Sequence, residues 1–88
     1  ANSYARSQAY LIDEGGVVAV YEGVPGTFAG ISLSWPSEVT TVPVSALDPV
    51  TAGRLKSGLR VDGLTEAHEL VAGYRARIAA EATSAPAP

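Results

Sequence analysis

Apolar and polar side chains alternate through the first half of the chain in patterns that predict β structure. Two apolar runs, residues 9–13 and 17–24, flank Gly15 and Gly16. Because glycine adopts positive φ without steric cost, this pair can reverse the chain tightly, and the two runs are predicted to form a β-hairpin. The second run is apolar on both faces, which is typical of a central strand covered on each side.

Further strands are predicted after this hairpin. Pro25 and Gly26 suit the two central positions of a type II turn, so they are predicted to end the second strand. Residues 31–35 alternate apolar and serine side chains, and Pro36 ends their pairing or places them at a sheet edge. Residues 39–44 form another β-prone run. The alternating run is expected to point its apolar side chains toward the core: Ile31, Leu33 and Trp35.

Helix signals dominate the second half of the chain. Asp48 followed by Pro49 predicts a helix start, and Gly58 predicts its end in a left-handed cap. Residues 59–63 are interpreted as a connector. A longer helix is predicted over residues 66–80, because apolar positions recur there at intervals of three and four. This apolar stripe consists of Ala67, Leu70, Val71, Tyr74 and Ile78.

These elements predict one α+β domain over residues 9–80, in which a small antiparallel sheet of three to four strands is packed by two C-terminal helices. Thr65 is the expected N-cap of the second helix. Residues 1–8 are interpreted as a flexible leader or juxtamembrane linker. Residues 81–88, rich in alanine and proline, are interpreted as a disordered tail.

Composition removes several classes of function. The 88 residues suffice for one small domain, and the net charge of −3 with six scattered Lys and Arg residues gives no reason to expect a nucleic-acid partner. The absence of cysteine excludes disulfides, thiolate catalysis and cysteine-based zinc sites. No apolar run reaches the length of about 20 residues that crosses a bilayer. The absence of methionine predicts a matured product or a piece of a longer protein, with any span or signal peptide upstream of Ala1.

Candidate catalytic and metal-binding groups are few. His68 is the sole histidine, so a histidine cluster for a metal is excluded, and we interpret this residue as a solvated helix position. Asp13 and Glu14 offer carboxylates beside the glycine turn, and they are interpreted as solvated turn residues rather than cation ligands. We therefore expect no catalytic residue, metal site or cofactor in this chain.

Aromatic side chains supply the best candidates for a binding surface. Phe28 and Trp35 are interpreted as core aromatics, and their exposure as anchors for a partner is the alternative. If the chain binds a partner, we expect the sheet edge and residues 28–35 to form the surface. The candidate residues for binding a ligand or partner are Tyr21, Phe28 and Trp35.

Three segments carry a resemblance to a known family. They read SQAYLI at residues 7–12, VAVYEGVPG at 18–26 and GISLS at 30–34. In this order they resemble the C-terminal extracytoplasmic segment of the membrane-bound, metal-dependent Ser/Thr protein phosphatases of the PP2C type from actinobacteria. The resemblance extends over residues 7–77, because the β segment, short helix and final helix of that family follow in the same order.

The resemblance implies a domain without catalytic residues of its own. The parent enzymes carry a cytoplasmic catalytic domain with an aspartate-bound pair of Mn²⁺ or Mg²⁺ ions, a linker, one transmembrane helix and this outer domain. The chain is thus expected on the extracytoplasmic side of a single-pass membrane protein. Asp13 and Glu14 do not match the metal motifs of the catalytic domain. Glu22 stands where the family often has a basic residue, so a shared charged-ligand role does not carry over to it.

Our leading hypothesis is a non-catalytic binding or sensing domain of such a phosphatase. Its partner would be an extracytoplasmic ligand or protein, with cell-wall fragments as first candidates, and the charged fraction of 17% favours weak homodimerisation. The alternative is a free secreted interaction or inhibitor domain with no attached enzyme. A small hydrolase is a third hypothesis, against which the absence of a histidine-paired nucleophile motif counts.

Overall fold

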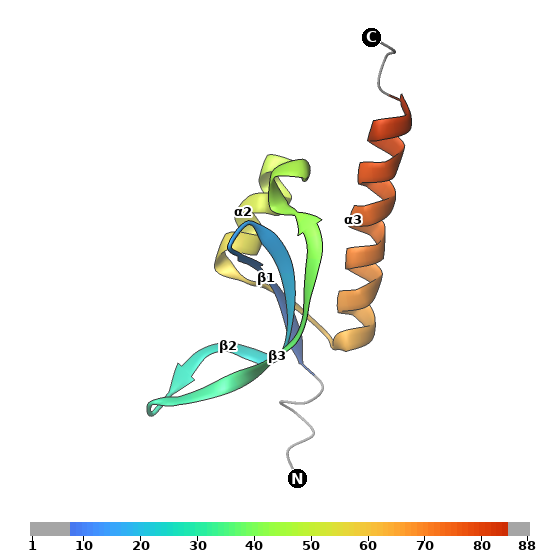
Figure 1. Cartoon of the computed structure of the whole chain (residues 1–88). Helices are drawn as coiled ribbons and strands as arrows, with labels where there is room; N and C mark the ends of the chain where they lie inside the picture. Colours follow the sequence, from blue (N-terminus) through green and yellow to red (C-terminus); the bar gives the residue numbers. More distant parts are fainter. Residues whose placement is uncertain (1–7, 85–88) are drawn as a thin grey trace.

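A four-stranded antiparallel sheet and two α-helices make up the protein, in a computed structural model that describes residues 8–84 (Figure 1). The strand order is β3-β2-β1-β4, which confirms the predicted α+β class. Most of the predicted leader, residues 85–88 of the predicted tail, and the side chain of Phe28 lie outside the described residues. The elements along the chain are β1 (Ala9–Glu14), β2 (Val17–Phe28), β3 (Ile31–Pro43), the 3-10 turn η1 (Val44–Ala46), α2 (Pro49–Ser57), β4 (Leu59–Val61) and α3 (Leu64–Ser84).

The first hairpin forms as predicted. Glu14 of β1 stands opposite Val17 of β2, and the two glycines between them have φ values of +62° at Gly15 and +96° at Gly16. Two central residues with positive φ define the type I′ turn, whose twist matches that of the strands. The carboxylate of Asp13 accepts a hydrogen bond from the backbone N–H of Gly16 at 2.8 Å, which stabilises the turn.

The second hairpin reverses later than predicted. β2 continues through Pro25 and Gly26 to Phe28. The chain turns instead at Ala29 and Gly30, whose φ values are +53° and +79°. The prediction that β2 ends in a type II turn was therefore wrong.

A bulge in β2 accounts for the error. Gly23 pairs with Ser34 and Thr27 pairs with Ser32, so β2 carries extra residues between these two pairs. Gly26 uses its positive φ of +98° inside the bulge rather than in a turn. Pro25, which has no N–H, is tolerated in the bulge because the ladder requires no hydrogen bond from this position.

A second irregularity between β2 and β3 is stabilised by Thr40. The register shifts between Val17 and Ala19, and such a shift leaves backbone groups without ladder partners. The buried hydroxyl of Thr40 donates to the carbonyl of Val18 at 2.7 Å and accepts from the N–H of Val42 at 3.1 Å. One side chain thus satisfies both backbone groups.

The sheet ends in β3 on one side and β4 on the other. β3 runs unbroken over Ile31–Pro43, so the strands predicted at residues 31–35 and 39–44 are one, and its edge position agrees with its prolines. The interpretation of residues 59–63 as a connector was wrong, because Leu59–Val61 pairs antiparallel with β1. A strand of three residues is too short to show a period in the sequence.

Capping residues place α2 where the sequence predicts it. Asp48 accepts from the N–H of Thr51 at 3.0 Å and from its hydroxyl at 2.7 Å. Gly58 ends the helix at the predicted residue, but its φ of +94° and ψ of +112° lie outside the left-handed helical region, so the predicted left-handed cap was wrong. The hydrogen bonds from Thr51 lower the pKa of Asp48. Arg77 of α3 lies 3.5 Å from the same carboxylate, so Asp48 also links the two helices.

α3 is longer than predicted at both ends. It spans Leu64–Ser84, so the expected N-cap Thr65 lies inside the helix. The carboxylate of Glu66 accepts from the backbone N–H of Asp62 at 2.9 Å, which satisfies a donor just ahead of the first turn. Residues 81–84 of the predicted tail are helical, and the alanines before and among them favour this extension.

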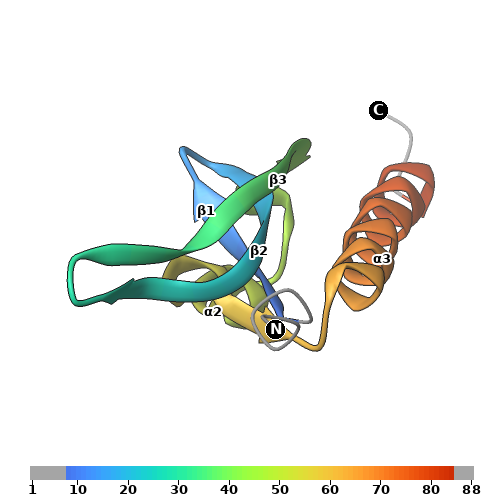
Figure 2. The same ribbon diagram turned by 90° about the horizontal axis from the view of Figure 1, so that it is seen from below.

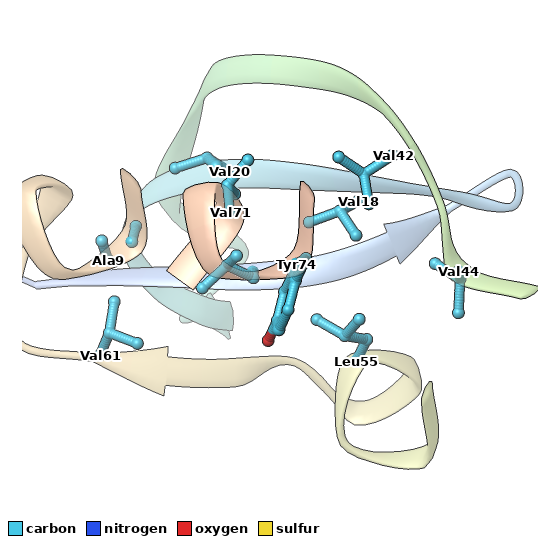
Figure 3. Packing of buried hydrophobic residues seen from close by; sticks show 11 residues of the cluster. Ala9, Val18, Val20, Val42, Val44, Leu55, Val61, Val71 and Tyr74 are labelled. Atoms are coloured by element: carbon cyan, nitrogen blue, oxygen red, sulfur yellow. The ribbon is translucent and has the colours of Figure 1, made fainter. Parts of the chain in front are cut away.

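One hydrophobic cluster joins the sheet to both helices (Figure 3). The central strand β2 is covered on both faces, as predicted, because Val18, Ala19 and Val20 are all fully buried. The apolar stripe of α3 packs on this cluster, and burial raises the pKa of Tyr74 within it. The cluster comprises Ala9, Leu11, Val18, Val20, Val42, Val44, Leu55, Val61, Ala67, Val71 and Tyr74, with Leu70 and Ile78 partly buried against it.

The expectation that Ile31, Leu33 and Trp35 reach the core was wrong. Their exposed fractions are 65%, 39% and 44%. Trp35 stands opposite Glu22, which stands opposite Ala9, so these side chains do lie on the core face of the sheet. The pattern of alternation therefore indicates the correct face of the sheet, but no other element of the described chain buries this face at residues 31–35.

The exposed residues lie on a projecting hairpin. Within the described chain, the ladder between β1 and β2 ends at Ala9 and Glu22, followed by one backbone hydrogen bond from Gly23 to Gln8, and beyond Gly23 β2 pairs with β3 alone. Figures 1 and 2 show the distal part of this hairpin extending away from the sheet and from both helices. We call residues 24–35 of the hairpin the arm.

Candidate partner-binding surface

Two tyrosines hold the base of the arm on the sheet. The rings of Tyr10 and Tyr21 stack with centroids 5.2 Å apart and an interplanar angle of 11°. Tyr10 is buried, and its hydroxyl donates to the hydroxyl of Ser34 at 2.9 Å. This contact ties β1 to the arm across β2, so it restricts the direction in which the arm leaves the sheet.

Close backbone packing at Gly23 sets the bend between the sheet and the arm. A Cβ atom at Gly23 would lie 2.1 Å from the carbonyl oxygen of Leu33 and 2.9 Å from Cζ3 of Trp35. The φ of Gly23 is +105°, a region that favours glycine, and its N–H donates to the carbonyl of Gln8 at 2.8 Å. Glycine is therefore required where the Trp35 ring lies over β2.

The surface of the arm is apolar and uncharged. Residues 31–35 read Ile, Ser, Leu, Ser and Trp, and no charged residue occurs between Glu22 and Glu38. The hydroxyl of Ser32 donates to the carbonyl of Ser34 at 3.3 Å along the same strand. Neighbouring apolar side chains that stay exposed are unfavourably hydrated, so the arm is a candidate interaction surface.

Comparisons of the whole chain with protein-family models, with curated proteins and with solved structures found no match. None of the helices in residues 8–84 combines the length and the apolar character needed to cross a membrane.

The three predicted binding residues lie in different surroundings. Trp35 is on the arm and exposed, so its interpretation as a core aromatic was wrong. Tyr21 lies half-buried at the base of the arm and donates a hydrogen bond to the carboxylate of Glu14, which raises the pKa of Tyr21. Phe28 belongs to β2 next to the turn, and its side chain lies outside the described part of the chain. A binding role for these residues stays a prediction.

Sequence reasoning missed Ile31 and Leu33 as surface residues, because alternation was interpreted as core packing. Two signals in the sequence point the other way. The long stretch without charge between Glu22 and Glu38 spans the whole arm. In addition, the helices predicted here offer one amphipathic stripe, which is too little apolar surface to cover two long strands over their full length.

The remaining polar side chains considered as candidate sites form ion pairs or hydrogen bonds within the protein. His68 of α3 has its Nε2 atom 3.9 Å from Oε1 of Glu38 on β3, and both side chains are about half exposed. Asp13 and Glu14 accept the hydrogen bonds described above. Across residues 8–84, His, Asp and Glu side chains form no group of three or more that could hold a metal ion.

A shallow groove lies between β3 and the second half of α3, and the sequence did not indicate it. Its volume is about 380 Å³, and Arg75 is its charged member. The groove is a second place where a partner could bind. Its lining residues are Thr41, Val42, Pro43, Arg75, Ile78, Ala79 and Ala82.

Proposed function

We propose that this chain is the non-catalytic outer domain of a membrane-anchored PP2C-type Ser/Thr phosphatase, and that it binds an extracytoplasmic ligand or partner through the arm. Dephosphorylation would be carried out by the cytoplasmic catalytic domain of the parent protein, with its own Mn²⁺ or Mg²⁺ ions. The resemblance supports the parent family. Its three segments fall on β1, on β2 and on the turn and start of β3, which are neighbours in the sheet.

The observation that carries the binding role is the exposure of the arm. Ile31, Leu33 and Trp35 are together on one face of a strand that projects beyond the core. Burying such side chains against a partner contributes roughly 25 cal/mol per Å² of apolar area removed from water. Because the arm is uncharged, the partner is expected to offer apolar or neutral polar groups, such as the peptide and sugar parts of cell-wall fragments.

Signalling through this domain would need a difference in affinity between two states of the parent protein. A ligand shifts an equilibrium only to the extent that it binds one state more tightly than the other. The arm suits this role because it is continuous with β2 and β3 and linked to β1 by the Tyr10–Ser34 hydrogen bond, so a partner that contacts it can act on the strands of the core.

Amide NMR with the isotopically labelled chain tests the binding role. We expect soluble cell-wall fragments or an envelope extract to shift the amides of residues 31–35, and the variant Leu33→Asp to weaken these shifts. The control Val50→Asp alters a residue of α2 that is 67% exposed and lies outside the arm, so it should leave the shifts unchanged. Shifts at the groove beside α3, or no shifts at all, would overturn binding through the arm.

The parent family is tested separately by the gene. A coding sequence that places a phosphatase domain with acidic metal ligands, followed by one apolar span, directly upstream of this chain supports the proposal. A signal peptide alone in that position overturns it and leaves the free secreted interaction or inhibitor domain as the alternative. The two experiments are independent, because binding through the arm could occur in either context.

A further inference from the structure

The outer edge of the arm carries backbone groups that face away from β2. β3 is an edge strand, and Phe28 and Ile31 flank the two-residue turn of the second hairpin. In such hairpins the flanking pair exchanges hydrogen bonds with each other, and the pattern then alternates along the strand. The N–H and C=O groups of Ser32 and Ser34 therefore point to the outer edge.

Proline limits the part of this edge that can pair. The next residue of β3 that faces outward is Pro36, which has no N–H to donate. Further along the strand Glu38 adds a charge and Pro43 ends the strand, and both discourage pairing with another strand. The usable edge is therefore residues 31–35.

We propose that the arm is the contact between two copies of this chain, which pair antiparallel along residues 31–35 about a two-fold axis at Leu33. The sequence of this segment is apolar, serine, apolar, serine, apolar in either direction. With Leu33 opposite Leu33 of the second copy, Ile31 stands opposite Trp35, and Ser32 exchanges backbone hydrogen bonds with Ser34. This register provides about four backbone hydrogen bonds between the copies.

Side-chain packing favours the same register. An aromatic residue opposite a β-branched one is a favourable cross-strand pair, and here Trp35 meets Ile31 twice. Because the two-fold axis of an antiparallel pair keeps both copies on the same face, the apolar side chains of the two arms form one continuous stripe. Sliding the register by two residues would instead place Ile31 opposite the polar Ser37 of the other copy, or set Ser34 against the turn.

Charge distinguishes a second copy from other occupants. A chain with a net charge of −3 is repelled by its copy in general, but the stretch between Glu22 and Glu38 brings no like charges together. An anionic lipid surface is less suitable, because binding to it relies on Lys and Arg near the contact and the arm has none. An acidic or basic protein partner would likewise find no opposite charge on the arm.

The size of the contact sets the strength of association. Two short segments with their side chains fall in the smallest class of interface, below about 1,200 Å² in total, so we expect a weak dimer that forms at high protein concentration. This proposal does not require the phosphatase parent, but it uses the same exposed side chains as the proposed ligand, so a second copy and that ligand would compete for the arm. Anchoring in a membrane would raise the local concentration of the arm and favour the same pairing.

Sedimentation equilibrium of the chain over a wide range of concentration tests the proposal. We expect the average mass to rise from that of the 9.0 kDa monomer toward twice that value. The fluorescence of Trp35, the single tryptophan, should move to shorter wavelength over the same range. Leu33→Asp and, separately, Leu33→Lys should weaken self-association by about tenfold or more, because two like charges then meet at the axis. A mixture of these two variants should restore a mixed dimer.

Two further variants guard against a folding artefact. Ser32→Pro removes an outward N–H, keeps the Tyr10–Ser34 hydrogen bond and should also abolish the dimer, while Val50→Asp, at a residue as exposed as Ile31 but on α2, should leave it intact. A variant is used only when its circular dichroism spectrum matches that of the unsubstituted chain. Ile31→Asp replaces any Leu33 variant whose spectrum does not match. A chain that stays monomeric, a dimer unaffected by the Leu33 variants, or a mixture that does not recover the dimer would each overturn the proposal. So would a blue shift of Trp35 in the monomer on neutral or anionic vesicles, because the occupant would then be lipid.

Discussion

The two halves of the β2–β3 hairpin both place apolar side chains on the core face of the sheet, but only one half is buried. Near the first turn, Val18 and Val20 alternate with Ala19 and all three are fully buried between β1, β3 and the helices. In the arm, Ile31 and Leu33 alternate with serines and stay exposed. Alternation indicates which side chains share a face of a strand, but burial depends on whether another layer covers that face.

The interactions that stabilise the two halves also differ. The core half is stabilised mainly by apolar burial around Leu55, Val18 and their neighbours. The arm depends on its ladder with the opposite strand, on the Tyr10–Ser34 hydrogen bond and on the close packing at Gly23. Because stability is not uniform across a protein, we expect the arm to open more easily than the core. Four predictions test this difference, starting with the largest effect.

The loss of unfolding free energy on truncating a leucine should differ most between the core and the arm. Leu55→Ala removes a fully buried side chain from the core and should cost about 2–5 kcal/mol of unfolding free energy, a large share of the roughly 5–15 kcal/mol available to a domain. The same change at Leu33 on the arm should cost about 0.5 kcal/mol or less. Urea denaturation followed by circular dichroism measures both. Equal costs would mean that the arm is part of the core.

The buried hydroxyl at the sheet irregularity gives the next effect. Thr40→Val keeps the shape of the side chain but leaves the Val18 carbonyl and the Val42 N–H without their partner, so it should cost about 1–3 kcal/mol. The neighbouring Thr41 is exposed, and Thr41→Val should change stability by no more than about 0.5 kcal/mol. Hydrogen exchange at the Val42 amide should accelerate in the first variant alone. Unchanged exchange there would argue against the bridging role of Thr40.

Gly23 tests the junction between the halves. Gly23→Ala adds a Cβ against the backbone of Leu33 at a positive φ, so it should displace the arm and cost about 1–2 kcal/mol or more. Gly26→Ala has a similar φ but open space around it, so it isolates the cost of the backbone conformation. We expect Trp35 fluorescence and the amides of residues 31–35 to change more in the first variant. Identical spectra for both would show that contact at Gly23 does not orient the arm.

The smallest effect concerns pH and the link between the helices. Because hydrogen bonds from Thr51 lower the pKa of Asp48 in the folded state, its carboxylate stabilises the fold above its ordinary pKa of about 3.9. This contribution is lost as the pH falls through the lowered pKa. Asp48→Asn retains an N-cap acceptor without the charge. Between pH 5 and strongly acidic solution, its urea midpoint should therefore fall less than that of the unsubstituted chain. The difference should be smaller than the effects above. An equal fall in both proteins would contradict the assignment.

Local signals in the sequence were sufficient for the parts of the fold that depend on neighbouring residues. The glycine pair before Val17, the Asp48 cap and the helix end at Gly58 each depend on hydrogen bonds or φ values within a few residues, and each lies at the predicted position. The apolar stripe of α3 is equally local, because it follows from the helical period. These features fixed the α+β class.

Features that depend on distant residues could not be predicted in this way. The strand β4 exists because Leu59–Val61 meets the free edge of β1, and its three residues carry no period of their own. Pro25 and Gly26 fit a turn and a bulge equally well. They lie in a bulge because the residues on either side of them, Gly23 and Thr27, pair with Ser34 and Ser32 of β3. For the candidate site, the sequence indicated the region of residues 28–35 but assigned its apolar side chains to the core.

The sequence by itself determined which side chains share a face and where the first chain reversal and α2 lie. Tertiary structure alone decided how far the helices extend over the sheet, and thereby separated a buried half of β2 and β3 from an exposed arm. The physical reason is that periodicity is a property of the local backbone, whereas burial requires a second surface brought into contact by the rest of the chain. Ile31, Leu33 and Trp35 lie on the core face of the sheet, beyond the reach of the core.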